Sequence, residues 1–469
     1  MTQTKPTVPA SLTGKWKPYP AYKDSGVEWL GEVPAHWEVK RVRDITELLQ
    51  TGPFGSQLHS SEYSHDGIPV INPSHLRDGH VYPDWDCTVD KETHLRLIRH
   101  ELHKGDIVFA RRGEMGRCAL ITEKEAGWLC GTGSLLMRPR VSLSAPSFLS
   151  KVLATGGVRD WLLLESVGST MDNLNTNILS RIPLPIPPLP EQYTIATYLD
   201  RETTRISALI AKKERLIELL QEKRAALISH AVTKGLDPTV PMKDSGIEWL
   251  GEIPAHWEVK RLKFVADVLN GVAKGRDLGQ RDVIELPYLR VANVQDGYLD
   301  LSDIALITVG VDEVERYSLQ RGDVLMNEGG DFDKLGRGYV WDGSITPCLH
   351  QNHVFAVRPH LGVDPYWISI ITLTSYAKHY FILKSKQSTN LASISGTNLK
   401  ELSVLMPPED ECNAILNYIK VTTARIDALI SRIREGIEKL KEYSSALISA
   451  AVTGKIDVRE IIGDHSEDL

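Results

Sequence analysis

The chain has 469 residues, enough for two to four domains with substantial cores. Apolar residues make up 42% and charged residues 25%, which excludes a mainly disordered chain, and charge or proline breaks every apolar run before about 18 residues, so no membrane span is expected. The formal net charge of −7 excludes a basic nucleic-acid footprint over the whole chain, while an N-terminus without a signal-peptide core and five scattered cysteines without C-x-x-C indicate a cytoplasmic protein with no disulfide framework or zinc site.

One period of 220 residues organises the chain. KDSGVEWLGEVPAHWEVKRV (23–42) returns as KDSGIEWLGEIPAHWEVKRL (243–262), with seventeen of twenty positions identical. RISALI (205–210) likewise returns as RIDALI (425–430). Between these constant parts lie two blocks with only a faint common skeleton: GDIVF and MRPR in the first match GDVLM and VRPH in the second. A constant frame around divergent inserts favours two equivalent domains that recognise different things over simple drift.

In chain order, we predict mixed α+β domains and long helices. The expected parts are an N-terminal tail (1–22), a first lead-in (23–42), variable block 1 (43–186), a long helix (187–233), a linker with the second lead-in (234–262), variable block 2 (263–406), a second long helix (407–453) and a C-terminal tail (454–469). Both blocks close in apolar, proline-punctuated strands, IPLPIPP and LSVLMPP.

The two long helices carry narrow apolar stripes with heptad spacing, which predicts an antiparallel coiled coil. Packing of each helix on its own domain alone is the alternative. The expected seam consists of Ile206, Ile210, Ile217, Leu220 and Leu227 in the first helix, and Ile426, Ile430, Ile433, Ile437, Leu440 and Leu447 in the second. Lys213 and Arg224 interrupt the first seam, and Ser444 interrupts the second.

A search for catalytic motifs finds no phosphate loop, H-E-x-x-H or G-x-S-x-G, and no catalytic amino-methyltransferase loop. Glu38-Val39-Lys40 and Glu258-Val259-Lys260 mimic a nuclease E-x-K, with Asp24 and Asp244 upstream. A metal site needs converging carboxylates, and the tryptophans around these triplets favour packing. We therefore expect no catalysis and no metal in this chain; a metal-dependent nuclease remains the enzyme alternative.

The variable blocks instead offer polar loops that contain arginine. Arg, Asn, Gln and Ser read base edges, and Lys and Arg hold phosphates. The candidate DNA-binding residues in block 1 are Ser56, Gln57, Asn72, Ser74, Arg77, Arg111, Arg112 and Arg117. Those in block 2 are Lys274, Arg276, Arg290, Asn293, Asn327, Arg337, Gln351, Asn352, Ser388 and Asn390.

The frame resembles that of the specificity (S) subunits of type I restriction-modification enzymes. The segments that carry the resemblance are both lead-ins, IPLPIPPLPEQ, TGPFGSQL, GDIVFARRGEMG, and the helix ends KRAALISHAVTKGLD and YSSALISAAVTGKID. The resemblance spans about residues 23–458.

The resemblance implies a non-catalytic subunit with two target-recognition domains, each reading one half of a split site in double-stranded DNA. The helices would set the unread spacer, and the C-terminal helix would meet the N-terminal lead-in in a circular arrangement. Two methyltransferase (M) subunits and restriction (R) subunits would be the partners, with S-adenosylmethionine, ATP and magnesium bound to them and no cofactor or membrane contact on this chain. A protein-interaction scaffold without DNA is the remaining alternative.

Overall fold

The computed structural model describes residues 16–166, 174–330, 335–387 and 392–459. Its contacts divide the chain into two units: unit 1 contains residues 1–212 and 435–469, and unit 2 contains residues 213–434. Both divisions fall inside the long helices, so each unit holds one part of each helix. Within the described residues, no helix is long and apolar enough to cross a membrane.

Unit 1 begins with the first lead-in, which forms three short strands. β1 (Tyr22–Asp24) pairs antiparallel with β2 (Glu32–Pro34), and β3 (Glu38–Arg41) pairs with β13 (Pro183–Ile186), the predicted closing strand of block 1. Trp37, between β2 and β3, is fully buried. The lead-in is therefore the packed base on which block 1 begins and ends.

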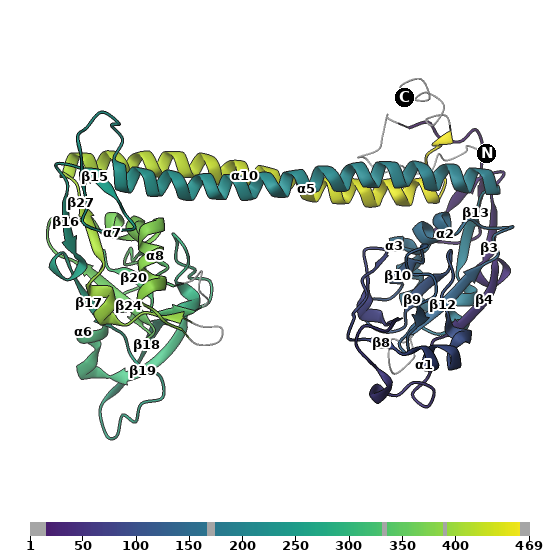
Figure 1. The fold of residues 1–469 in the computed structure, drawn as a ribbon, viewed down its shortest axis with the longest axis horizontal. Helices are drawn as coiled ribbons and strands as arrows, with labels where there is room; N and C mark the ends of the chain where they lie inside the picture. The colour runs from purple at the N-terminus through teal and green to yellow at the C-terminus, as the bar shows by residue number, and fades with distance from the viewer. Residues whose placement is uncertain (1–15, 167–173, 331–334, 388–391, 460–469) are drawn as a thin grey trace. The chain divides into compact units, whose positions relative to one another are not determined.

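Block 1 folds around a four-stranded antiparallel sheet in the order β10-β9-β12-β4 (Figure 1). Its strands are β4 (Thr46–Thr51), β9 (Ile107–Ala110), β10 (Cys118–Leu120) and β12 (Ser134–Pro139). A second sheet contains β5 (Ile68–Ile71), β8 (Thr88–Val89) and β11 (Leu129–Cys130), and β6 (Leu76–Arg77) pairs with β7 (His80–Val81). The helices are α1 (Lys91–Arg96), α2 (Pro146–Leu153), α3 (Gly156–Ser166) and α4 (Thr176–Arg181).

Unit 2 repeats this plan. β14 (Met242–Asp244) pairs with β15 (Glu252–Pro254), and β16 (Glu258–Arg261) pairs with the closing strand β27 (Ser403–Met406). The main sheet, in the order β17-β24-β20-β22, contains β17 (Ala266–Asn270), β20 (Val324–Asn327), β22 (Gly338–Val340) and β24 (Val354–Pro359). Two small sheets contain β18 (Val283–Leu289), β19 (Ala305–Gly310) and β23 (Leu349–His350), and β21 (Gly329–Gly330), β25 (Lys386–Gln387) and β26 (Ala392–Ser393). The helices are α6 (Val314–Tyr317), α7 (Pro365–Thr372), α8 (Ser375–Lys384) and α9 (Gly396–Lys400).

The two variable blocks thus share one topology although their sequences have little in common. Reversing the order of the second main sheet gives β22-β20-β24-β17, which matches β10-β9-β12-β4 strand by strand. In each block the second sheet contains one short parallel pair of strands, which is β5 with β11 in block 1 and β18 with β23 in block 2. The predicted α+β class and tandem repeat are confirmed.

The long helices α5 (Leu189–Lys234) and α10 (Glu409–Val452) begin two residues after the predicted starts. Their 46 and 44 residues correspond to about 69 and 66 Å at ~1.5 Å per residue. In unit 1 the first part of α5 shares a core with the last part of α10, and in unit 2 the last part of α5 shares a core with the first part of α10. This pairing makes the helices antiparallel, and the predicted coiled coil is confirmed.

The predicted seam positions are the more buried ones along both helices. Ile206, Ile426, Ile430, Ile433, Ile437 and Leu447 are buried, and Ile210, Ile217, Leu220, Leu227 and Leu440 are half-buried. Arg224, which interrupts the seam, pairs through Nε with Asp427 Oδ1 at 3.1 Å. The partner carboxylate on the facing helix explains how a half-buried arginine is tolerated there.

The residues after α10 return to the N-terminal segment within unit 1. The backbone amide of Asp457 donates to the carbonyl of Lys17 at 2.9 Å, and Lys455 Nζ donates to the carbonyls of Leu30 and Glu32 at 2.8 and 2.6 Å. In unit 2 the corresponding stretch, residues 235–243, is continuous chain. In unit 1 two separate segments, near residues 17 and 457, thus pair at the position that one continuous segment occupies in unit 2.

Candidate nucleic-acid interface

The repeated E-x-K triplets do not form a metal site. Glu38 pairs with Lys40 at 2.8 Å, and Glu258 pairs with Lys260 at 2.8 Å; both carboxylates are about two-thirds exposed. The hydrogen bond from the neighbouring lysine lowers the pKa of each glutamate. Over the described ranges, no group of three or more His, Cys, Asp or Glu residues could hold a metal ion. The geometry therefore offers no support for the nuclease alternative.

The lead-ins have a different task, which is to hold the start of each long helix. Glu191 in the first turn of α5 is buried and accepts hydrogen bonds from Tyr19 Oη at 2.8 Å and Trp37 Nε1 at 3.1 Å, with His36 Nε2 at 2.8 Å. In unit 2, Glu411 meets His256 Nε2 at 2.7 Å and Trp257 Nε1 at 3.1 Å. The Pro-x-x-Glu spacing and the repeated His-Trp pair were the sequence signal for this contact, which sequence reasoning missed.

In unit 1 the candidate loops of block 1 converge at one end of the sheets. Gly131 donates its backbone N–H to Ile71 O at 2.9 Å, and Arg111 donates its backbone N–H to Gly133 O at 3.0 Å. A Cβ on Gly52 would lie 1.9 Å from Gly131 O, so only glycine allows this approach. The loops at 52–57, 72–77 and 111–117 therefore belong to one surface, which we call loop cluster 1.

Within loop cluster 1 the predicted side chains divide by exposure. Ser56, Ser74, Arg77 and Arg112 are exposed, whereas Gln57, Asn72, Arg111 and Arg117 are half-buried. Asn72 Nδ2 donates to Cys87 Sγ at 3.2 Å, and Arg111 Nε donates to Leu174 O at 3.3 Å. The exposed group is available for a ligand, while Asn72 and Arg111 support the loops; base contact stays a prediction for all eight.

In unit 2 the loops that contain residues 271–276, 290–293, 327 and 350–352 form the equivalent surface, which we call loop cluster 2. Its backbone contacts repeat those of unit 1: a Cβ on Gly271 would lie 2.1 Å from His350 O, and Gln351 donates its backbone N–H to Leu289 O at 2.9 Å. Asn327 Nδ2 reaches Val294 O at 3.0 Å and so joins the β20 loop to this cluster.

Many predicted side chains of block 2 are engaged inside the fold. Buried Asn293 donates through Nδ2 to Asp300 O at 2.9 Å and to Asp303 O at 2.8 Å, and Asn327 is buried as well. Arg276 makes a bidentate pair with Glu313 at 2.9 and 2.8 Å, and Arg290 Nη2 contacts Asp303 at 2.8 Å.

The remaining predicted residues of block 2 are less constrained. Lys274 is exposed and Arg337 half-buried. Gln351 Oε1 accepts the Val291 N–H at 3.4 Å, and Asn352 Nδ2 lies 3.4 Å from His353 Nε2. Ser388 and Asn390 lie outside the described residues. In loop cluster 2, Arg276 and Arg290 are thus already paired with carboxylates, and the base contacts of this cluster too stay predictions.

Each block also contains an Asp–Arg ion pair, which lies at the end of its main sheet opposite the loop cluster. Arg138 on β12 donates through Nε and Nη2 to Asp106, both at 2.8 Å, and Arg358 on β24 does the same to Asp323 at 2.7 and 2.8 Å. Both aspartates are 1% exposed. These residues are the Asp of the shared Gly-Asp and the Arg of the shared Arg-Pro, so the faint sequence skeleton encodes one ion pair twice.

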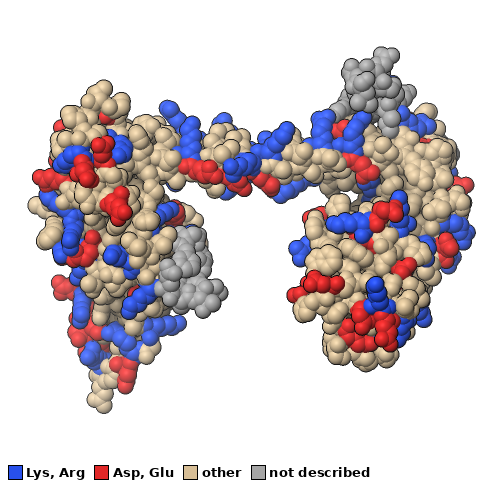
Figure 2. Space-filling model, in the orientation of Figure 1, with Lys and Arg blue, Asp and Glu red and all other residues tan. Residues whose placement is uncertain are grey.

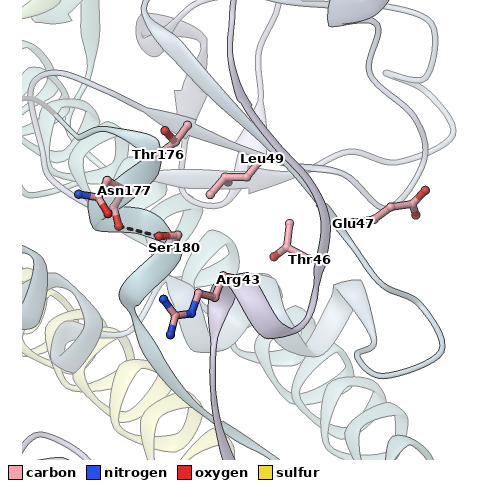
Figure 3. Close-up of a pocket in the computed structure, with 7 residues that line it drawn as sticks. All are labelled: Arg43, Thr46, Glu47, Leu49, Thr176, Asn177 and Ser180. Carbon is pink, nitrogen blue, oxygen red and sulfur yellow. Dashed lines mark hydrogen bonds between the residues drawn. The ribbon is translucent and has the colours of Figure 1, made fainter.

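A surface pocket lies elsewhere in block 1. Figure 3 shows a pocket between β4 and α4, lined by Arg43, Thr46, Glu47, Leu49, Thr176, Asn177 and Ser180. Ser180 Oγ donates to Asn177 O at 2.7 Å, and none of the predicted base-reading residues lines the pocket. On the face drawn in Figure 2, Lys and Arg are interspersed with Asp and Glu over both units.

Comparisons with known proteins agree with this architecture. Residues 34–219 match the family described as "Type I restriction modification DNA specificity domain". The EcoKI specificity subunit of Escherichia coli K12 is 24% identical over 443 residues, covering 91% of this chain and 90% of that protein. The StySPI specificity subunit of Salmonella potsdam is 23% identical, with the same coverage of each chain.

Solved structures share the fold. A chain from a study of complex assembly and conformational transition of the type I R-M system aligns with a TM-score of 0.64 at 18% identity, over 90% of this chain and 99% of that one. The HsdS subunit of Thermoanaerobacter tengcongensis aligns with a TM-score of 0.51 at 16% identity, over 90% and 98%. In sequence, duplicated frame and fold, the chain is similar to the specificity subunits of type I restriction-modification enzymes, and residues 34–219 match their DNA specificity domain.

Proposed function

We propose that the chain is the DNA-reading subunit of a type I restriction-modification complex, with each variable block reading one half of a bipartite site. The observation that carries this proposal is the pair of loop clusters. Two blocks of one topology hold equivalent loops at the same end of equivalent sheets, yet the side chains on those loops differ. A repeated scaffold with unlike loops is suited to two different half-sites.

The chain performs no chemistry itself in this proposal. M subunits bind to the constant regions and supply S-adenosylmethionine, and R subunits supply the ATP- and magnesium-dependent steps. The coiled coil sets the spacer between the half-sites. The five cysteines are all free thiols in the structure, which supports a reducing cytoplasm as the place of action.

The charge distribution supports a division of the DNA phosphate contacts between this chain and the M subunits. Residues 37–186 contain 17 basic and 18 acidic residues, and a protein that neutralises few phosphates gains little from counterion release. We expect the isolated chain to bind DNA weakly and the complex with M subunits to bind tightly, as a gel shift at physiological salt measures. Tight specific binding by the chain alone would contradict this division.

The test of the function is genome-wide methylation mapping with and without the chain. A bipartite motif should appear only when the chain is present. Exchange of residues 43–186 for the block of another family member should change one half of that motif and leave the other unchanged. If both halves change, the blocks are not separate readers; if no motif ever appears, a scaffold without DNA recognition becomes the better reading.

A further inference from the structure

Phe54 is an exposed aromatic ring at the tip of loop cluster 1. Its side chain is 51% exposed, although a buried phenylalanine would contribute about 1.5–3 kcal/mol to folding. The residues on both sides are anchored: Gly52 and Pro53 are buried, and Leu58 is 4% exposed. The fold therefore holds this loop firmly and still leaves its largest apolar side chain in solvent.

The loop is also closed on itself by hydrogen bonds. Phe54 N donates to Gln57 Oε1 at 3.2 Å, and Gln57 N donates to Phe54 O at 2.6 Å. Arg96 Nη1 on α1 donates to Gln57 O at 2.6 Å. At the other end of the turn, the backbone of Gly52 packs closely against the carbonyl of Gly131. Because the turn is braced at both ends, the ring loses little conformational freedom when it meets a ligand.

The neighbourhood of the ring is cationic. The Arg111 guanidinium lies 5.4 Å from the ring centroid, and Arg112 next to it is exposed. Arg111 itself is fixed by its bond to Leu174 O. A rigid apolar projection beside arginines is what proteins use to separate two stacked bases while nearby cations hold the phosphates.

At the equivalent position block 2 has a small side chain in place of this ring. Gly52 and Gly271 each follow the first strand of their main sheet and make the same close backbone approach, so the third residue after the strand is Phe54 in one block and Ala273 in the other. A methyl group cannot separate stacked bases. At this position loop cluster 1 therefore has a side chain large enough to separate bases, and loop cluster 2 does not.

We propose that Phe54 is a wedge that inserts between two stacked bases in the half-site read by block 1, whereas block 2 reads its half-site without such a distortion. This inference rests on the proposed function. It predicts that half-site 1 favours a flexible pyrimidine–purine step at the wedge position, because such steps unstack most readily.

The experiment uses the full chain assembled with its methyltransferase subunits and duplexes that carry the mapped site. 2-Aminopurine is placed at successive positions of each half-site, since its fluorescence rises when it unstacks. Methyltransferase subunits flip the bases that they methylate; apart from those positions, we expect a rise at one step of half-site 1 and none in half-site 2. Phe54→Ala should remove the rise and weaken binding by roughly 5- to 150-fold, the range that aromatic–base stacking gives. Phe54→Trp should preserve both.

Controls separate the wedge from folding and from the function itself. Trp85→Ala removes another ring of the same unit, 53% exposed, and should change neither signal. Phe54→Leu keeps an apolar wedge and should retain part of the fluorescence rise even if the alanine variant folds poorly. If Phe54→Ala binds and unstacks like wild type while half-site 1 is still read, the wedge is refuted and the proposed function stands. If the wild-type complex binds no specific site, both are refuted.

Discussion

Asp106→Asn removes one charge from the Asp106–Arg138 ion pair, at the end of the main sheet opposite loop cluster 1, and keeps the shape of the side chain. The carboxylate accepts two bonds from Arg138 at 2.8 Å and one from the backbone N–H of His103 at 2.7 Å. Hydrogen bonds to charged groups contribute about 1.5–3 kcal/mol each, but the Arg138 side chain is 23% exposed and water can replace part of the loss. We expect a cost of about 2–3 kcal/mol.

Arg138→Met should cost more, because it leaves the 1% exposed carboxylate of Asp106 unpaired. Removal of one partner from a buried pair costs about 3–5 kcal/mol. For a domain of this size each kcal/mol shifts Tm by about 2–4 °C, so the two variants should lower the Tm by roughly 4–12 and 6–20 °C. The double variant should cost less than the sum of the single ones.

Chemical denaturation gives these free energies, and hydrogen exchange read by mass spectrometry locates them. Peptides from β9 and β12 should lose protection, while those from β20 and β24 should not. Asp323→Asn and Arg358→Met provide the matched pair in unit 2, and they should show the same order of costs with the locations exchanged. A cost below about 0.5 kcal/mol for Asp106→Asn, or a larger cost for it than for Arg138→Met, would refute this account.

Three other changes test separate parts of the molecule. Burial lowers the pKa of His350, so below the ordinary histidine pKa of about 6.5 only the unfolded chain gains a proton there. The free energy of unfolding of unit 2 should therefore fall from pH 6.5 toward pH 5, by up to about 1.4 kcal/mol per pH unit. Denaturation at each pH measures this fall, which should be less steep in His350→Gln. A circular permutant that links residue 459 to residue 17 and opens the chain at Thr239 should assemble and methylate the same motif, because Asp457 already contacts Lys17; a changed motif would contradict this. One heptad inserted after residue 212 and another after residue 434 keeps the seam in register and adds about 10 Å, so methylation mapping should show a spacer longer by about three base pairs.

The frame was predictable from sequence because it is written twice. The repeat gave the lead-ins, the closing strands and the helices, and the heptad spacing gave the seam. Arg224 looked like a defect in that seam, since its partner Asp427 is on the other helix and no sequence rule pairs residues so far apart.

The candidate site was less predictable, because composition does not say which polar side chain supports a loop and which one faces solvent. Asn293 has the amide expected of an adenine reader, yet its Nδ2 bonds to two backbone carbonyls. Arg276 pairs with Glu313, thirty-seven residues away in sequence. Phe54 was overlooked because an apolar residue in a Gly-Pro-rich turn is usually assigned to packing.

The Asp–Arg ion pairs lie wholly inside their blocks, and the His–Glu contacts between each lead-in and the first turn of its long helix lie wholly inside the constant frame. Genetic exchange at either of the near-identical lead-ins would therefore transfer a complete variable block together with its own Asp–Arg ion pair. A lineage could acquire a new half-site in one event, without any compensating change in the parts that the enzyme's other subunits use.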